Sequence, residues 1–184
     1  MKCRARAVLY GNAIIVGSVE EARCLYKLGF YGQPLGVEKP KGADFSSPLR
    51  LTPLEALYLL EKGILEVYDE GGRNPLSFEK LRERFREHYS DLQTYYRIYK
   101  DLRDNGLIVR SGLKYGAVFT VYRLGPGLEH APFILHVRGY NDDLEPTDIV
   151  RAGRLSHSVR KAFILASSEP NGNPVYLIFK WLVP

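Results

Sequence analysis

A turn-rich segment near the middle of the chain constrains the fold more than any other feature. Residues 70–75, Glu-Gly-Gly-Arg-Asn-Pro, are dominated by turn-forming residues and have no apolar periodicity. On both sides of this segment, strand patterns alternate with helix patterns, and 184 residues suffice for two small domains. We therefore predict an α/β (α+β) protein with a small mixed domain over residues 1–74 and a second domain, a mixed sheet flanked by helices, over residues 75–184.

The first domain contains clear signals for a β-hairpin and for a core helix. Strand patterns cover residues 4–10 and 13–16, and Gly11 followed by Asn is a hairpin turn signal. The helix signal is a capping box, in which Thr52 is followed three residues later by Glu55, with proline at the first helical position.

Between these two signals lies a long loop that is rich in glycine and proline. It covers residues 31–48 and carries Lys39 and Lys41. Loops of this length in compact domains are usually functional or mobile. We expect Lys39 and Lys41 to serve a binding function.

Composition narrows the class of protein. The chain is 45% hydrophobic, which suffices for a core, and its net charge of +5 favours a polyanionic partner without requiring one. No apolar run is long enough to span a bilayer, and the N-terminus lacks the apolar stretch of a signal peptide. We expect a soluble, cytoplasmic protein in which Cys3 and Cys24 remain thiols.

The second domain is predicted to begin with a helical segment, residues 77–105, and to continue with strands, a helix and a last strand. Gly106 follows the helical segment in the position of a C′ glycine. The expected elements are helices at 78–88, 92–105 and 147–166 and strands at 107–109, 114–123, 133–138 and 175–183.

The expected helix at 147–166 carries cations along one face. At helical spacing, four polar side chains fall within an arc of roughly 80° that no acidic residue interrupts. These side chains are Arg151, Arg154, Ser158 and Lys161. From charge alone, a solvated surface is the more common explanation of such a face, although the spacing also suits phosphates.

Three further residue types suggest phosphodiester chemistry. Tyr122 ends a strand-like run, His130 follows a Gly-Pro-Gly loop, and Lys161 lies in the basic helix. Each residue alone is more often structural or a surface group. Together, a phenol, an imidazole and an ammonium can take a proton, give a proton and stabilise negative charge. No two histidines have metal-ligand spacing, so we expect no metal and no cofactor.

Nearly the whole chain resembles the archaeal tRNA-splicing endonucleases. Several motifs carry this resemblance. They are the run 99–122 ending in Phe-Thr-Val-Tyr, Gly-Pro-Gly-Leu-Glu-His-Ala at 125–131, Arg-Leu-Ser-His-Ser-Val-Arg-Lys at 154–161, Leu-Tyr-Lys-Leu-Gly-Phe-Tyr-Gly at 25–32 and Leu-Glu-Ala-Leu-Tyr-Leu-Leu-Glu-Lys-Gly at 54–63. The resemblance implies a catalytic nuclease domain in the second half of the chain.

The resemblance also implies an activity and a catalytic triad. The family excises introns from precursor tRNA by cutting at bulge–helix–bulge motifs without a metal, leaving 2′,3′-cyclic phosphate and 5′-hydroxyl ends. Its tyrosine, histidine and lysine fall on Tyr122, His130 and Lys161. Tyr122 is implied to act as base toward the RNA 2′-hydroxyl, His130 to protonate the leaving 5′ oxygen, and Lys161 to stabilise the phosphorane. A free phenol has a pKa of about 10, so the basic surroundings are expected to lower that of Tyr122.

Family members also hold a bulge base between two cationic side chains. Arg154 matches one of them, and the other falls near Lys180, beside Trp181, where some relatives have arginine. An ammonium stacks on a base less well than a guanidinium. The expected RNA contacts are Arg151, Arg154, Lys180, Trp181, Lys39 and Lys41.

The resemblance implies a tetramer whose subunits pair through their last strand. An acidic loop before that strand fills a basic pocket of another subunit in the family. Here the corresponding loop, residues 168–173, contains only Glu169 as an acid. We therefore expect a heterotetramer with a structural subunit, or else a homotetramer.

Two alternatives to a catalytic nuclease remain. Helices at 78–88 and 92–105 followed by a strand–turn–strand also suit a winged-helix nucleic-acid-binding protein. The chain could also be a non-catalytic structural subunit of the same endonuclease. The presence of Tyr122, His130 and Lys161 favours the catalytic subunit.

Overall fold

The structure is a computed structural model that describes residues 3–40, 42–89, 91–113, 117–159 and 161–179, without the side chains of 151 and 155–159. It has two compact units, Met1–Leu92 and Gln93–Pro184. The sequence places the domain boundary earlier, after residue 74, whereas the contacts group the first helix beyond that point with the first unit. Each unit is a mixed sheet with helices, as predicted for the fold class.

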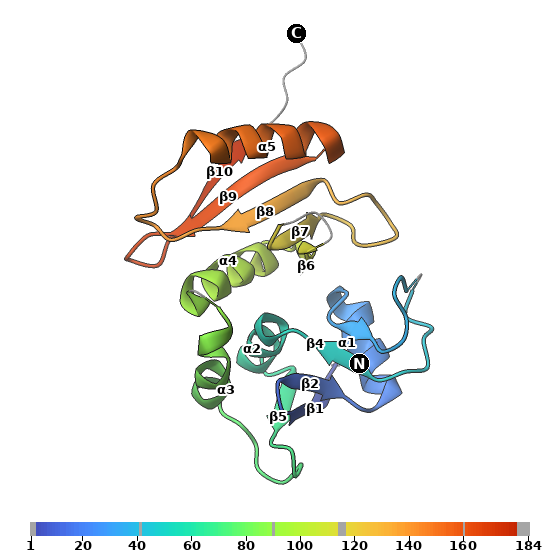
Figure 1. Cartoon of the computed structure of the whole chain (residues 1–184). Coiled ribbons are helices and arrows are strands. Elements are labelled where there is room, and N and C mark those ends of the chain that lie inside the picture. Colours follow the sequence, from blue (N-terminus) through green and yellow to red (C-terminus); the bar gives the residue numbers. More distant parts are fainter. Residues whose placement is uncertain (1–2, 41, 90, 114–116, 160, 180–184) are drawn as a thin grey trace. The chain divides into compact units, whose positions relative to one another are not determined.

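The first unit (Figure 1) contains a five-stranded sheet with the order β3-β4-β2-β1-β5. Its strands are β1 (Ala5–Tyr10), β2 (Ala13–Val16), β3 (Gln33–Pro34), β4 (Leu49–Leu51) and β5 (Leu65–Tyr68). Its helices are α1 (Val19–Gly29), α2 (Pro53–Glu61), α3 (Phe78–Phe85) and the short 3₁₀ helix η1 (Arg86–His88).

The helix and hairpin signals of the first unit are confirmed. Strands β1 and β2 pair antiparallel around the turn at Gly11, which has a φ of 57°. Helix α2 begins with a complete capping box between Thr52 and Glu55. The other carboxylate oxygen of Glu55 accepts a hydrogen bond of 2.9 Å from the backbone N–H of Gly32, which explains why this charged residue is buried.

Strands β3 and β4 lie where the sequence predicts only a loop. Leu49 pairs with both Pro34 and Val16, so β4 lies between β3 and β2. The rest of the long loop therefore closes a hairpin, and the backbone N–H of Leu35 donates to the carbonyl of Pro48 at 2.9 Å. Strands of two and three residues carry too little periodicity to be recognised without their partners.

The two cysteines are joined, contrary to the expectation of free thiols. A disulfide links Cys3, before β1, to Cys24 in α1, across 21 residues of sequence. The Cα atoms lie 5.9 Å apart, within the range that a disulfide spans. Only the packing of α1 beside β1 reveals this proximity.

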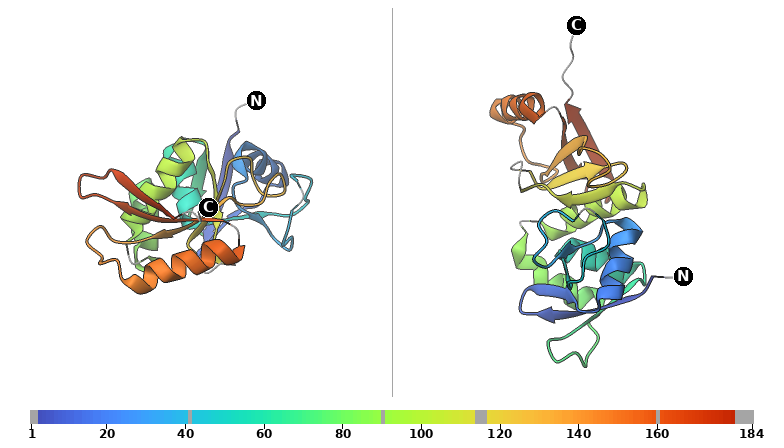
Figure 2. Two further views of the ribbon diagram at one scale, coloured as in Figure 1. Left: turned by 90° about the horizontal axis from the view of Figure 1, so that it is seen from above. Right: turned by 90° about the vertical axis from the view of Figure 1, so that its right-hand side faces the viewer.

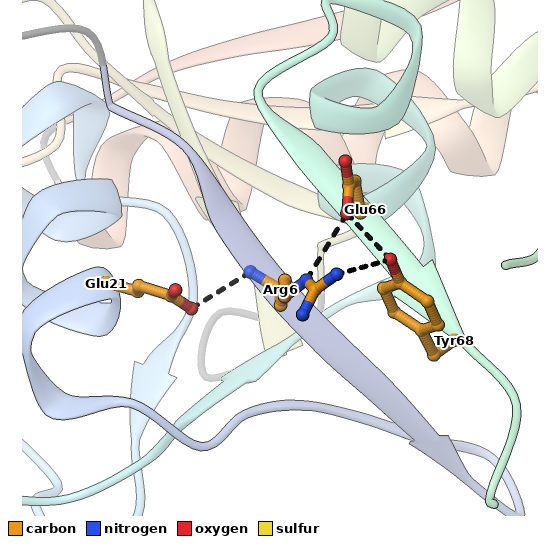
Figure 3. A network of polar contacts seen from close by, with 4 residues as sticks. All are labelled: Arg6, Glu21, Glu66 and Tyr68. Carbon is orange, nitrogen blue, oxygen red and sulfur yellow. Dashed lines mark hydrogen bonds and ion pairs between the residues drawn. The ribbon is translucent and has the colours of Figure 1, made fainter. Parts of the chain in front are cut away.

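A polar network connects the parallel strands β1 and β5 on their exposed side (Figure 3). Arg6 and Glu66 are direct cross-strand partners, and their side chains form an ion pair of 3.4 Å. The hydroxyl of Tyr68 accepts from Arg6 Nη2 at 2.9 Å and donates to Glu66 at 2.8 Å. Glu21 of α1 accepts from the backbone N–H of Arg6, so the network also fixes α1 to the sheet.

The second unit contains a five-stranded sheet with the order β10-β9-β8-β7-β6. Its strands are β6 (Ile108–Ser111), β7 (Phe119–Tyr122), β8 (Phe133–Val137), β9 (Ala162–Ser168) and β10 (Pro174–Phe179). Its helices, α4 (Leu92–Asp104) and α5 (Pro146–Val159), lie on opposite faces of this sheet (Figures 1 and 2).

Both faces of the second sheet are therefore packed. The ring of Tyr99 in α4 lies 6.0 Å from that of Phe119 on one face. On the other face, Ala152 of α5 belongs to a cluster with Ile134 and Phe163. Thr120, whose cross-strand partner Ile134 belongs to this cluster, is buried as well.

The predicted helix over residues 147–166 is wrong at its C-terminal end. Helix α5 ends at Val159, and β9 begins at Ala162. The apolar residues of this stretch fit a helical stripe equally well, but in the fold they lie in a strand that pairs with both β8 and β10. Tertiary pairing thus overrides a local pattern that periodicity alone cannot resolve.

Candidate active site

The register of the second sheet brings two of the three candidate catalytic residues to one end of it. Val121 of β7 pairs with Phe133 of β8, and Phe133 pairs with Ala162 of β9. Tyr122 directly follows the first of these residues, and Lys161 directly precedes the last. Because neighbouring strands are about 4.8 Å apart, the Cα atoms of Tyr122 and Lys161 are separated by about 10 Å, with β8 between them.

The third candidate residue lies at the same end of the sheet. Strand β7 runs antiparallel to β8, and β9 runs parallel to β8, so the end of β7 meets the starts of the other two strands. His130 precedes β8 by three residues and is exposed, whereas Tyr122 and Lys161 are half-buried. All three candidates thus lie near the N-terminal end of β8.

Lys161 is attached to the segment that carries the histidine. Its Nζ atom donates a hydrogen bond of 2.6 Å to the carbonyl of Ala131, the residue after His130. Burial lowers the pKa of the Lys161 ammonium below its ordinary value of 10.5, because desolvation disfavours the charged form. Lys161 lies just before β9 and not on a helix, which corrects the expectation of a basic helical face that includes it.

The loop between Tyr122 and His130 has a defined conformation. Gly125 and Gly127 have φ values of 126° and 84°, which other residues adopt only with strain. The carbonyl of Gly125 accepts hydrogen bonds of 3.2 Å from the backbone N–H groups of Leu128 and Glu129. The Gly-Pro-Gly sequence therefore builds a tight turn that returns the chain toward β8.

Sequence reasoning missed two residues in this region. Arg123 follows Tyr122, and its guanidinium lies 5.2 Å from the centre of the Phe133 ring. Glu129 precedes His130, and its carboxylate accepts hydrogen bonds from two backbone N–H groups of the same loop. The signal in the sequence was that each lies next to a candidate catalytic residue. That signal is weak, because single charged residues in loops are usually solvated.

The remaining expected RNA contacts are only partly described. Arg154 is exposed on α5, and Lys39 is exposed in the loop between β3 and β4. Arg151 lies on α5, but its side chain is outside the description. The other three expected contacts lie outside the described residues; they are Lys41, Lys180 and Trp181.

The described part of the chain contains neither a cluster of metal-binding side chains nor a helix that could span a membrane. No group of three or more His, Cys, Asp or Glu side chains in it is arranged to hold a metal ion. No helix within the same residues is both long enough and apolar enough to cross a membrane.

Comparisons with known proteins agree over both units. A family model described as tRNA intron endonuclease, N-terminal domain, matches residues 5–82, and one described as tRNA intron endonuclease, catalytic C-terminal domain, matches residues 92–176. A tRNA-splicing endonuclease from Hyperthermus butylicus is 53% identical over 180 residues, which are 97% of this chain and 99% of the relative. One from Saccharolobus solfataricus is 42% identical over 179 residues, 96% of this chain and 98% of the relative.

Proposed function

Because the chain belongs to the tRNA intron endonuclease family, we propose that it is an endoribonuclease that excises introns from precursor tRNA. We further propose that it cuts at bulge–helix–bulge motifs without a metal. The expected products carry 2′,3′-cyclic phosphate and 5′-hydroxyl ends. The observation that carries this proposal is the gathering of Tyr122, His130 and Lys161 at one end of the second sheet.

In the proposed reaction the RNA supplies its own nucleophile. Tyr122, as the phenolate, takes the proton of the 2′-hydroxyl while the 2′ oxygen attacks the adjacent phosphorus. His130, as the imidazolium, gives a proton to the 5′ oxygen as the bond between phosphorus and that oxygen breaks. No external nucleophile is consumed, which accounts for a cyclic phosphate as product.

Lys161 is assigned to the negative charge that builds on the phosphorane. Its attachment to the carbonyl of Ala131 holds the ammonium beside the segment that carries His130. Partial burial strengthens the interaction between the ammonium and the phosphate oxygens, because less water screens it. A lysine held in place in this way stabilises the charge of the transition state more than a mobile surface lysine does.

The other RNA contacts and the assembly follow from the family resemblance. We assign Arg154 and Lys180 to the bulge base and Arg151 and Trp181 to the neighbouring RNA. Exposed Lys39 lies in a loop that closes a hairpin, which suits an RNA contact shared with Lys41.

Strand β10 is the proposed assembly edge. It lies at the end of the sheet order, and three of its apolar side chains are 43–49% exposed; these are Val175, Leu177 and Ile178. An apolar edge strand favours pairing with another chain. We propose a tetramer, either of this chain alone or with a structural subunit.

The test is cleavage of a bulge–helix–bulge RNA in excess EDTA, with analysis of the product ends. We expect cyclic phosphate and 5′-hydroxyl ends from the unaltered chain, and a rate lower by roughly 10²–10⁴ for His130→Ala. His88→Ala is the matched control, because His88 is an exposed histidine of η1 that packs on Phe85. Absence of cleavage both alone and with a candidate structural subunit would contradict the proposal.

A further inference from the structure

The carboxylate of Glu129 closes the loop that separates Tyr122 from His130. Its Oε1 atom accepts a hydrogen bond of 2.5 Å from the backbone N–H of Arg123 and one of 2.6 Å from that of Leu124. The N–H of Arg123 belongs to the peptide group that directly follows Tyr122. One side chain therefore joins the end of β7 to the residue before His130.

These hydrogen bonds favour the charged form of the carboxylate. The backbone N–H groups of Leu124, Arg123 and Gly125 lower the pKa of Glu129 below its ordinary value, and the charge of Arg123 contributes in the same direction. Hydrogen bonds from neutral donors to a charged acceptor are stronger than those between neutral groups. The loop is thus closed by ionic hydrogen bonds although its surface is exposed to solvent.

The rest of the loop is held by backbone hydrogen bonds, from Leu128 and Glu129 to the carbonyl of Gly125, and little by side-chain packing. Gly125 and Gly127 supply the turn but have no side chains to hold it. Leu124 and Leu128 are 62% and 68% exposed, so neither side chain is packed into the core. The position of His130 relative to Tyr122 therefore depends on polar contacts, among which those of Glu129 connect the two ends of the loop.

We propose that Glu129 is a positioning residue for cleavage, which sets the distance between Tyr122 and His130 through its backbone hydrogen bonds. This role rests on the proposed function, because it requires these two residues to act on the same phosphodiester. Glu129 itself takes no proton from the RNA. Its effect is on geometry, and misplacement of a catalytic group by about 1 Å costs on the order of 10²-fold in rate.

The first test measures the loop without using activity. Hydrogen–deuterium exchange is followed in overlapping fragments that contain the amides of Arg123 and Leu124. We expect faster exchange in Glu129→Ala, and near-normal exchange in Glu129→Gln, whose amide oxygen can still accept both hydrogen bonds. Unchanged exchange in Glu129→Ala would overturn the proposed closure, whatever the chain does to RNA.

The second test separates positioning from folding and from charge. Single-turnover cleavage and RNA binding are measured for Glu129→Ala, Glu129→Gln and the control Glu145→Ala, in the connection before α5. We expect Glu129→Ala to lower the cleavage rate on the order of 10²-fold with little change in RNA affinity, and Glu129→Gln to restore most of it. Unfolding temperatures identify any loss that reflects unfolding alone.

The outcomes distinguish the two proposals. A normal rate for folded Glu129→Ala would overturn the positioning role while leaving the nuclease intact. Equal losses of rate in Glu129→Gln and Glu129→Ala, with near-normal amide exchange in Glu129→Gln, would also overturn it, because the charge and not the closure of the loop would then matter. Failure of the unaltered chain to cleave RNA, with its structural subunit present, would instead overturn the proposed function.

Discussion

The two sheets differ in what surrounds a cation beside their parallel strand pair. Among the described strands, each sheet contains one parallel pair, β1 with β5 in the first unit and β8 with β9 in the second. Arg6 on β1 faces Glu66 on β5, and their charges meet each other. In the second sheet, the start of β9 follows Lys161, whose ammonium meets a backbone carbonyl.

The pKa values of these two cations shift in opposite directions. Hydrogen bonds to Tyr68 and to the carboxylate of Glu66 raise the pKa of the Arg6 guanidinium, so the fold strengthens its charge. Burial lowers the pKa of the Lys161 ammonium, so the fold works against its charge. A cation whose charged form is disfavoured by burial is a candidate for a functional residue. A surface cation that is paired with a carboxylate is ordinarily structural.

Replacement of these two cations is expected to give the largest contrast. If Lys161 has its proposed role, Lys161→Gln should lower the cleavage rate by roughly 10²–10³, because the cation assigned to the phosphorane is lost. Arg6→Gln should leave the rate unchanged, because its partners are Glu66 and Tyr68. Single-turnover cleavage of the same RNA by both variants measures the difference. Equal losses of cleavage rate in the two variants would show that the different surroundings of Lys161 and Arg6 do not correspond to different functions.

The disulfide provides the next largest expected effect, and it belongs to the first unit alone. In a chain-entropy description, a link across 21 residues stabilises the fold by about 3 kcal/mol. Cys24→Ser, or reduction of the unaltered chain, should lower the free energy of unfolding by that amount. Denaturant unfolding with and without reductant provides the measurement.

The cleavage assay supplies the control for the disulfide experiment. At temperatures where the reduced chain stays folded, the cleavage rate should remain near normal, because the proposed chemistry belongs to the second unit. Cys24→Ser should not respond to reductant. No change in stability on reduction of the unaltered chain would contradict the assigned link.

The predictable parts of this fold were those with local causes. The α2 capping box and the turn at Gly11 each depend on a few adjacent residues, and both are present. Strand β9 and the disulfide could not be recognised, since β9 is fixed in part by its pairing with β8, and the disulfide by the packing of α1 beside β1. The identity of Tyr122, His130 and Lys161 came from a resemblance, whereas their common place at one end of the sheet required the register of three strands.

The smallest expected effect concerns the response of the Arg6–Glu66 pair to acid. Hydrogen bonds from Tyr68 and from Arg6 lower the pKa of the Glu66 carboxyl below its ordinary value of 4.5. A lowered folded-state pKa means that the contribution of the pair is complete above that ordinary value and is lost as the pH falls through the folded-state value. Because both side chains are exposed, water and salt screen the pair, and the contribution is small.

Unfolding temperatures of the unaltered chain and of Arg6→Gln should therefore differ slightly at neutral pH and converge in acid. Lys161→Gln is the matched control, because Lys161 has no part in this pair, so any difference in unfolding temperature between this variant and the unaltered chain should stay the same as Glu66 is protonated. A difference for Arg6→Gln that persists unchanged below the folded-state pKa of Glu66 would show that Arg6 stabilises β1 through Tyr68, whose hydroxyl accepts its hydrogen bond and whose ring centre lies 5.0 Å from the guanidinium, and not through the carboxylate of Glu66. Convergence would show that the ion pair between Arg6 and Glu66 stabilises the first sheet. The charge of Arg6 would then be structural, in contrast to the charge of Lys161.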